Sequence, residues 1–219
     1  MGPFPHSAPR SVISPENPAG TDGFEFVEFA HPEPEKLRET FLRMGYANVA
    51  RHKTKAIELW QQGDITYVLN DEPASHARAF VAEHGPCAPS MCWRVADATA
   101  AFAHAISQGA RPYYGPGKAM DLPAIVGIGG SLLYFTDAYP NSNRYDAEFI
   151  RTGIPKPKGV GFYYLDHLTH NVHRGNMDKW FHFYKGLFNF HQIRFFVSIR
   201  RGPRLCGLDV LCCGFPVPR

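Results

Sequence analysis

The chain has 219 residues, of which 44% are hydrophobic and 14% aromatic, enough to form the core of one large domain or two small ones. Its formal net charge is +3, and the first 190 residues contain no dense run of lysine or arginine. Composition therefore gives no support for a protein that binds nucleic acid or a membrane surface, and a small molecule is the expected partner.

The first twenty residues are rich in proline and serine and contain no continuous apolar block. Neither a signal peptide nor a membrane span fits this composition, so we expect a disordered arm over residues 1–20 of a cytoplasmic protein. The cysteines are odd in number and none are spaced as Cys-X-X-Cys, which predicts reduced thiols rather than a disulfide framework or a zinc ribbon. They are Cys87, Cys92, Cys206, Cys212 and Cys213.

The patterned part of the chain opens with a strand followed by a helix. Residues 24–30 are aromatic and β-branched, which predicts a strand. Pro34 then begins a segment with Leu37 and Phe41 on one helical stripe, and this helix is expected to stop at Gly45. Three short extended runs follow, separated by turn-like residues, and they predict a β-α-β-β-β unit. The runs are residues 46–52, 55–61 and 64–70.

A second set of elements follows the same scheme. Ser75 can cap a helix over residues 76–84, and Asp97 can cap a helix over residues 98–108. Residues 90–96 and 129–137 read as strands. The glycines of Gly127–Gly130 are followed by a strand and by no Lys-Ser/Thr pair, so a tight turn is favoured over a phosphate-binding loop.

A polar, proline-containing segment over residues 139–159 is expected to be a linker between domains. The residues after it repeat the opening of the first domain, a strand followed by a helix, when Phe26–Phe29 is aligned with Tyr164–His167. This alignment places His167 at the position of Phe29. If the two copies share a scaffold, that position is expected to face the interior in both, with an aromatic side chain in the first copy and a metal ligand in the second.

His167 is therefore the candidate metal ligand. In isolation, a histidine at a strand end is more often a half-buried residue with one hydrogen bond. Side chains three residues apart on a strand face opposite sides, so His170 is expected to be structural, and Asp166 is expected to point away from His167. The remaining histidines of this region are expected in a loop, a helix and a turn, without a role at the site. They are His173, His182 and His191.

Three segments carry a resemblance to a known family: NPAGTDGFEFVEFAHPEPEKL, GIGGSLLYFTD and YYLDHLTHNVHRGNMDKWFHFYKGLFNFHQIRFF. They resemble bacterial 4-hydroxyphenylpyruvate dioxygenase, a two-domain member of the vicinal oxygen chelate superfamily, over roughly Asn17 to Phe196. The resemblance implies an α+β fold of paired βαβββ modules. One complete barrel is expected over residues 21–138, with a structural role, and the start of a second, catalytic barrel over residues 160–196.

The family resemblance also implies a chemistry. Fe(II) is held by two histidines and one carboxylate, and 4-hydroxyphenylpyruvate and O2 take the open positions. The reaction releases CO2, hydroxylates the ring and gives homogentisate in tyrosine catabolism. Residue by residue, His167 matches the first histidine ligand, and the intact family member is expected to be a homo-oligomer.

The resemblance ends abruptly after Phe196. Residues 197–219 hold three of the five cysteines and no family pattern, which suggests a truncated or frameshifted gene end. The second histidine and the glutamate would lie beyond that point, so we expect the chain alone to be inactive. We also expect residues 160–196 to expose apolar surface and lower solubility unless they pack on the first domain or on another chain.

Two other functions stay open at this level. A hydroxymandelate synthase shares the fold, metal and substrate and differs in the carbon that it hydroxylates. The first barrel has Phe29 where the second has His167, so it could instead be a metal-free binding or assembly module.

Overall fold

The computed structural model describes residues 9–139, 144–173, 175–198 and 208–214. Its elements in chain order are β1 (Thr21–Ala30), α1 (Pro34–Arg43), β2 (Ala47–His52), β3 (Ile57–Gln62), β4 (Ile65–Asn70), α2 (His76–His84), β5 (Cys87–Val95), α3 (Ala98–Ser107), β6 (Ala124–Val126), β7 (Leu132–Thr136), β8 (Phe149–Arg151), β9 (Asn171–Val172), α4 (Met177–Phe188), β10 (His191–Ser198) and β11 (Leu208–Gly214). Short 3₁₀ helices cover Ile128–Gly130 and Arg144–Ala147.

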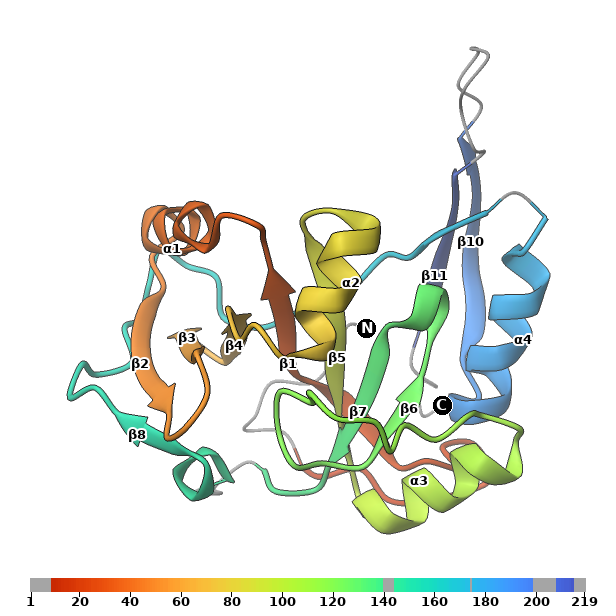
Figure 1. The fold of residues 1–219 in the computed structure, drawn as a ribbon. Coiled ribbons are helices and arrows are strands. Elements are labelled where there is room, and N and C mark those ends of the chain that lie inside the picture. Colours follow the sequence, from red (N-terminus) through yellow and green to blue (C-terminus); the bar gives the residue numbers. More distant parts are fainter. Residues whose placement is uncertain (1–8, 140–143, 174, 199–207, 215–219) are drawn as a thin grey trace, which may run out of the picture.

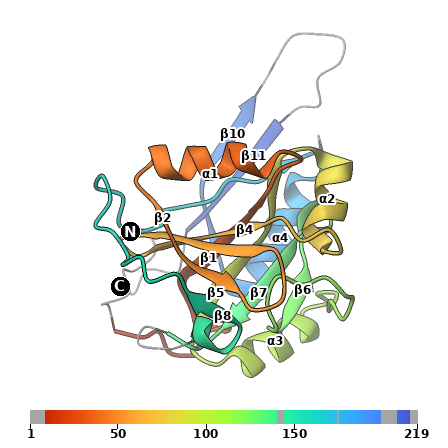
Figure 2. The same ribbon diagram turned by 60° about the vertical axis from the view of Figure 1, so that its left-hand side comes forward.

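Eight strands form one mixed sheet in the order β6-β7-β5-β1-β4-β3-β2-β8. The β1–β4 and β5–β7 pairs are parallel, and the other neighbours are antiparallel. In Figure 2, α1 lies above β1 and β4 while α3 lies below β6 and β7. The predicted β-α-β-β-β unit and the strand–helix elements that follow it are confirmed, and β1 joins the two halves of the sheet.

Local sequence signals account for the helix boundaries. The Ser75 hydroxyl accepts a hydrogen bond from the Arg78 backbone N–H at 3.0 Å, and the Asp97 carboxylate accepts one from the Ala100 N–H at 2.8 Å. Both predicted caps are confirmed. The glycines after β6 form a tight turn in which the Gly127 N–H donates to the Ser131 carbonyl at 2.7 Å, as predicted.

Apolar side chains fill the space enclosed by the sheet. Phe26, Leu59, Val68 and Tyr134 are fully buried there and belong to one contiguous cluster. A binding site for a small molecule inside the first barrel would have to displace these side chains, and their close packing favours a structural role for this domain.

Two predicted irregular segments differ from expectation. Within the predicted arm, Arg10 donates hydrogen bonds to the carbonyls of Ala96 and Asp137, so residues 9–20 lie against the domain; residues 1–8 are outside the described ranges. Within the predicted linker, β8 pairs with β2 and extends the sheet. Pairing with the β2 edge outweighs the weak local propensity of the β8 segment, and side-chain hydrogen bonds from Arg10 hold the arm.

The strand predicted before His167 is wrong. Residues 157–170 run in an irregular path, and only Asn171–Val172 pair, as β9. The helix predicted next is confirmed as α4, which lies at the opposite end of the molecule from β8 (Figure 1). Of the predicted tail, residues 208–214 form β11, which pairs with β10 and β9; residues 199–207 and 215–219 lie outside the described ranges.

Helix α4 packs on the first domain. Its Phe188 ring lies 5.1 Å from the Trp93 ring and 6.2 Å from the Phe135 ring, between centroids, and Phe188 is fully buried. Residues 160–196 were expected to lower solubility unless they packed on the first domain. Helix α4 does pack on it. Val160, Phe162 and Tyr163 remain exposed.

Candidate functional site around His167

His167 lies in an exposed part of the chain between Leu165 and Leu168, which both pack against the core. Leu165 packs against two core clusters, one under α1 and one under α4, and Leu168 packs against the second of these. The side chains of Asp166 and His167 are 60% and 66% exposed. The expectation that His167 faces the interior is therefore wrong, because the segment is not a strand and the repeat alignment does not fix its side-chain direction.

Asp166 and His167 form a pair. The Nδ1 atom of His167 lies 2.7 Å from Oδ2 of Asp166, and because a carboxylate can only accept, Nδ1–H is the donor. The prediction that Asp166 points away from His167 is wrong for the same reason as above. In a neutral imidazole this bond leaves the lone pair on Nε2, which is the arrangement found where a histidine binds a metal through that atom.

His170 is structural, as predicted. Its ring stacks on the Tyr184 ring at 5.5 Å between centroids, and its Nε2 atom is hydrogen-bonded to the Tyr184 hydroxyl at 3.1 Å. Burial lowers the pKa of His170 to about 4, because the imidazolium form would lose its hydration.

This lowered pKa predicts an acid-sensitive contribution to stability. Between pH 6.5 and about 4, His170 is protonated in the unfolded chain but stays neutral in the folded chain. The free energy of unfolding therefore falls as the pH drops through this window. The expected loss is up to about 3 kcal/mol. Urea unfolding from pH 7 to pH 4 measures it, and His170→Phe should remove this part of the slope while His182→Ala leaves it unchanged. An identical slope in the His170 variant would contradict the assignment.

The other histidines of the segment stand apart from His167. His173 is exposed in a loop, and the exposed His182 on α4 donates from Nδ1 to the Asp178 carbonyl at 2.6 Å. Both agree with expectation. His191 begins β10 instead of lying in a turn, so that expectation is wrong, and its side chain lies outside the described set.

The residues that the structure describes do not form a complete metal site. Within the described ranges, no three side chains of histidine, cysteine, aspartate or glutamate are grouped so that they could hold a metal ion. His167 offers one nitrogen, Nε2, and its other nitrogen is hydrogen-bonded to the Asp166 carboxylate. A single donor does not define the coordination of Fe(II), so the described residues do not fit that ion on their own.

The first copy uses the equivalent positions for packing. Phe29 lies in an aromatic cluster, with its ring centroid 4.8 Å from that of Tyr67 and 5.6 Å from that of Phe41. Beside it, Glu28 is buried and accepts hydrogen bonds from Ser90 and from the Asn70 amide. Burial raises the pKa of Glu28. Glu28 is buried and Phe29 is half-buried among aromatic rings, whereas Asp166 and His167 are exposed to solvent.

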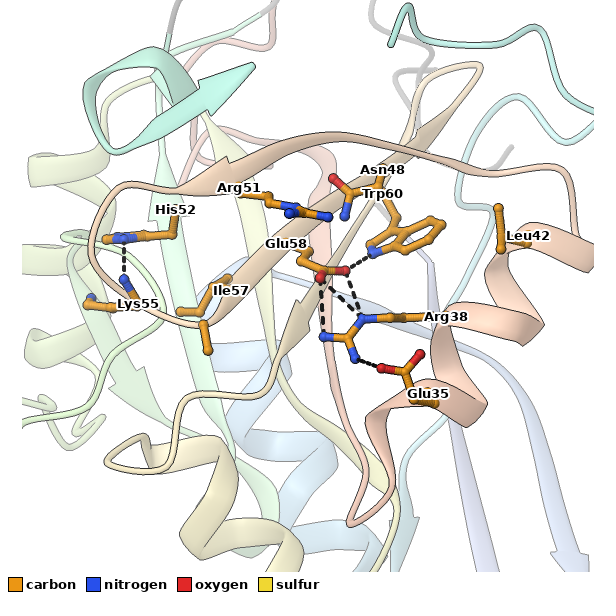
Figure 3. Close-up of a pocket in the computed structure, with 11 residues that line it drawn as sticks. Glu35, Arg38, Leu42, Asn48, Arg51, His52, Lys55, Ile57, Glu58 and Trp60 are labelled. Carbon is orange, nitrogen blue, oxygen red and sulfur yellow. Dashed lines mark hydrogen bonds and ion pairs between the residues drawn. The ribbon is translucent and has the colours of Figure 1, made fainter. Parts of the chain in front are cut away.

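A cleft of about 640 Å³ between α1 and the β2–β3 hairpin was not predicted. Its polar groups largely bind one another: Glu58 accepts hydrogen bonds from Nε of Arg38 at 3.2 Å and from Nε1 of Trp60 at 2.9 Å, and Glu35 contacts Arg38 at 2.5 Å (Figure 3). The spacing of Glu35 and Arg38 on one helix face was the available signal. We assign this network to holding α1 on the sheet.

None of the described helices has the length and apolar character needed to cross a membrane.

Comparison with known proteins places the chain in a family. Residues 15–150 match the family described as hydroxyphenylpyruvate dioxygenase, N-terminal. A 4-hydroxyphenylpyruvate dioxygenase of Pseudomonas aeruginosa is 46% identical over 191 residues, covering 84% of this chain and 54% of the relative. The hemolysin VllY of Vibrio vulnificus is equally similar, with the same coverage of both chains. The chain thus spans about half the length of the curated relatives it matches.

A solved structure supports the same placement. A fusion of a xylose isomerase-like TIM barrel with a 4-hydroxyphenylpyruvate dioxygenase superposes with a TM-score of 0.71 at 31% identity, covering 90% of this chain and 30% of that one. The eight-stranded sheet, the filled interior and these matches agree. The chain belongs to the family of hydroxyphenylpyruvate dioxygenase N-terminal domains.

Proposed function

We propose that this chain supplies the first domain and the beginning of the second domain of a 4-hydroxyphenylpyruvate dioxygenase. The reaction would be the Fe(II)- and O2-dependent conversion of 4-hydroxyphenylpyruvate to homogentisate. The observation that carries the proposal is the 46% identity to the Pseudomonas aeruginosa relative over 84% of the chain. A match of that extent in a 219-residue chain must run past residue 150 and over His167.

In this proposal the two domains divide the work. The first domain has its core filled by apolar side chains and holds Phe29 in an aromatic cluster, so it acts as a scaffold. His167 is the first of the metal ligands. Asp166 orients the imidazole and stabilises it as a donor, and the other ligands belong to the half of the relatives that this chain does not span.

Fe(II), when bound to a complete ligand set, supplies the activation of O2 and a chelating position for the α-keto acid. Because the described residues supply one candidate ligand, no step of the reaction is assigned to them beyond holding and orienting that ligand.

A hybrid protein tests the proposal. Residues 1–196 are joined to the part of the Pseudomonas aeruginosa relative that follows its matching segment. With Fe(II) and O2 the hybrid is expected to convert 4-hydroxyphenylpyruvate to homogentisate, measured by chromatography, whereas the 219-residue chain in the same assay is expected to be inactive. A hybrid that folds with a cooperative melting transition but forms no homogentisate would overturn the proposal.

A further inference from the structure

The segment that leads to His167 is bound to the β3–β4 turn of the first domain by main-chain contacts. The Gly63 N–H donates to the Pro157 carbonyl at 3.3 Å, and the Asp64 N–H donates to the Tyr163 carbonyl at 2.6 Å. Between these two points, the Val160 N–H donates to Oε1 of Gln62 at 3.1 Å. We call residues 157–163 the strap.

Gln62 joins the strap to a second element. Its side chain is fully buried, and while Oε1 accepts from Val160, Nε2 donates to the Met44 carbonyl at the end of α1 at 2.6 Å. The two partners fix the orientation of the amide, because a carbonyl can only accept and an N–H can only donate. Gln62 therefore fixes the distance between the end of α1 and the strap.

Glycines allow the close approach. Gly63 has a φ of +50°, and a Cβ atom built on it would lie 2.6 Å from Cα of Tyr163. On the other side, a Cβ on Gly159 would overlap the Gln62 side-chain amide. At Gly63 main chain therefore lies directly against main chain, and at Gly159 main chain lies directly against the Gln62 amide, so neither position has room for a side chain.

The strap ends four residues before His167. From Tyr163 the chain reaches Leu165, which is held between two core clusters, and then the exposed pair of Asp166 and His167. Exposed side chains have few contacts of their own, so the position of this pair is set by how the chain before and after it is anchored.

We propose that Gln62 is a positioning residue of the first domain that sets the place of the Asp166–His167 pair through the strap. The part of this inference that concerns a metal ligand rests on the proposed function of His167. Loss of the Gln62 amide would release the strap and let the pair sample more positions. A complete site would then bind its metal more weakly, because ordering the ligand would oppose binding.

The first test uses the full chain and does not depend on activity. Amide hydrogen exchange at Val160 and the NMR order parameter of the His167 amide are compared in wild type, Gln62→Met and Gln61→Met. Methionine keeps the length of the side chain and removes the hydrogen bonds of the amide. Gln61 is the matched control on the same strand, since its amide bonds Thr66 at 2.9 Å and makes no hydrogen bond to the strap.

In Gln62→Met, exchange at Val160 is expected to rise roughly tenfold. The order parameter of His167 is expected to fall from about 0.85 to below about 0.6. Gln61→Met should change neither. An unchanged order parameter at His167 with an opened Val160 amide would overturn the inference, since Gln62 would then hold the strap without positioning the pair.

Two further variants cover the case in which Gln62→Met does not fold. Gly159→Ala disturbs the same contact from the exposed strap and is expected to mobilise His167 equally. Gln62→Glu offers a rescue, because the protonated carboxyl can both accept from Val160 and donate to Met44. At pH 8 the carboxylate still accepts from Val160 but cannot donate to Met44, so His167 should be as rigid as in wild type at pH 5 and more mobile at pH 8. A rigid His167 in Gly159→Ala, or no difference between the two pH values, would contradict the assignment.

The hybrid protein separates this inference from the proposed function. The Fe(II) concentration for half-maximal turnover is expected to rise several-fold in the Gln62→Met hybrid, with kcat nearly unchanged. An active hybrid with the same Fe(II) requirement in both forms would overturn the inference alone. An inactive wild-type hybrid would overturn the proposed function, and the order parameter of His167 would still decide the positioning role of Gln62.

Discussion

Replacing Phe188 with alanine is expected to lower the free energy of unfolding by about 3–5 kcal/mol, the largest stability effect that we predict. The Phe188 ring is fully buried where α4 meets the first domain, with Trp93 and Phe190 each 5.1 Å away between centroids. Its removal leaves a cavity in that interface and takes away the contacts between these rings. Urea unfolding followed by tryptophan fluorescence measures the change.

Phe162→Ala is the matched control, since it removes the same ring from a position that is 48% exposed. Surface substitutions of this kind usually change stability by less than about 0.5 kcal/mol. Equal effects of the two variants would mean that α4 does not pack on the first domain in solution.

Replacing His167 with alanine in the hybrid is expected to lower turnover of 4-hydroxyphenylpyruvate at least about a hundredfold. The imidazole would supply a neutral nitrogen donor to Fe(II), and alanine offers no donor in its place. Because the side chain is 66% exposed, the substitution should leave the melting temperature nearly unchanged. Turnover and bound iron are measured on the same preparation.

Two variants define the specificity of that result. His182→Ala removes another exposed histidine from the same region and should keep full activity. Asp166→Asn keeps the shape of the side chain but weakens its hydrogen bond to Nδ1 of His167. It is expected to lower the affinity for Fe(II) by about 10- to 100-fold. Undiminished turnover in His167→Ala would remove this residue from the site.

The elements of the first domain could be predicted because local signals and tertiary packing agree there. Ser75 and Asp97 cap the helices that follow them, and the alternating residues of β1 place Phe26 in the core. Strands β6 and β8 were missed because three residues carry too little pattern to be recognised. Their positions are set by pairing with β7 and β2.

The surroundings of His167 could not be predicted for a different reason. The repeat alignment identified a position that is aromatic in one copy and imidazole in the other, and Phe29 is indeed part of a packed aromatic cluster. It also imposed a strand on residues 160–167 that the structure lacks. The strap is held by the Gln62 side-chain amide and by main-chain contacts with Gly63 and Asp64, and such contacts leave no periodic signal in a sequence.

The first domain supports the segment that carries His167, because α4 packs on it and the strap is hydrogen-bonded to it. Native-state hydrogen exchange of the full chain at low urea concentrations measures whether the two parts unfold together. We predict that the amides of Tyr184, Leu187 and Phe188 in α4 open with the same free energy as those of Leu133 and Phe135 in β7, because their side chains share one core cluster. Exchange of the α4 amides about a hundredfold faster than those of β7 would show that the two parts unfold independently and that the first domain does not support the His167 segment.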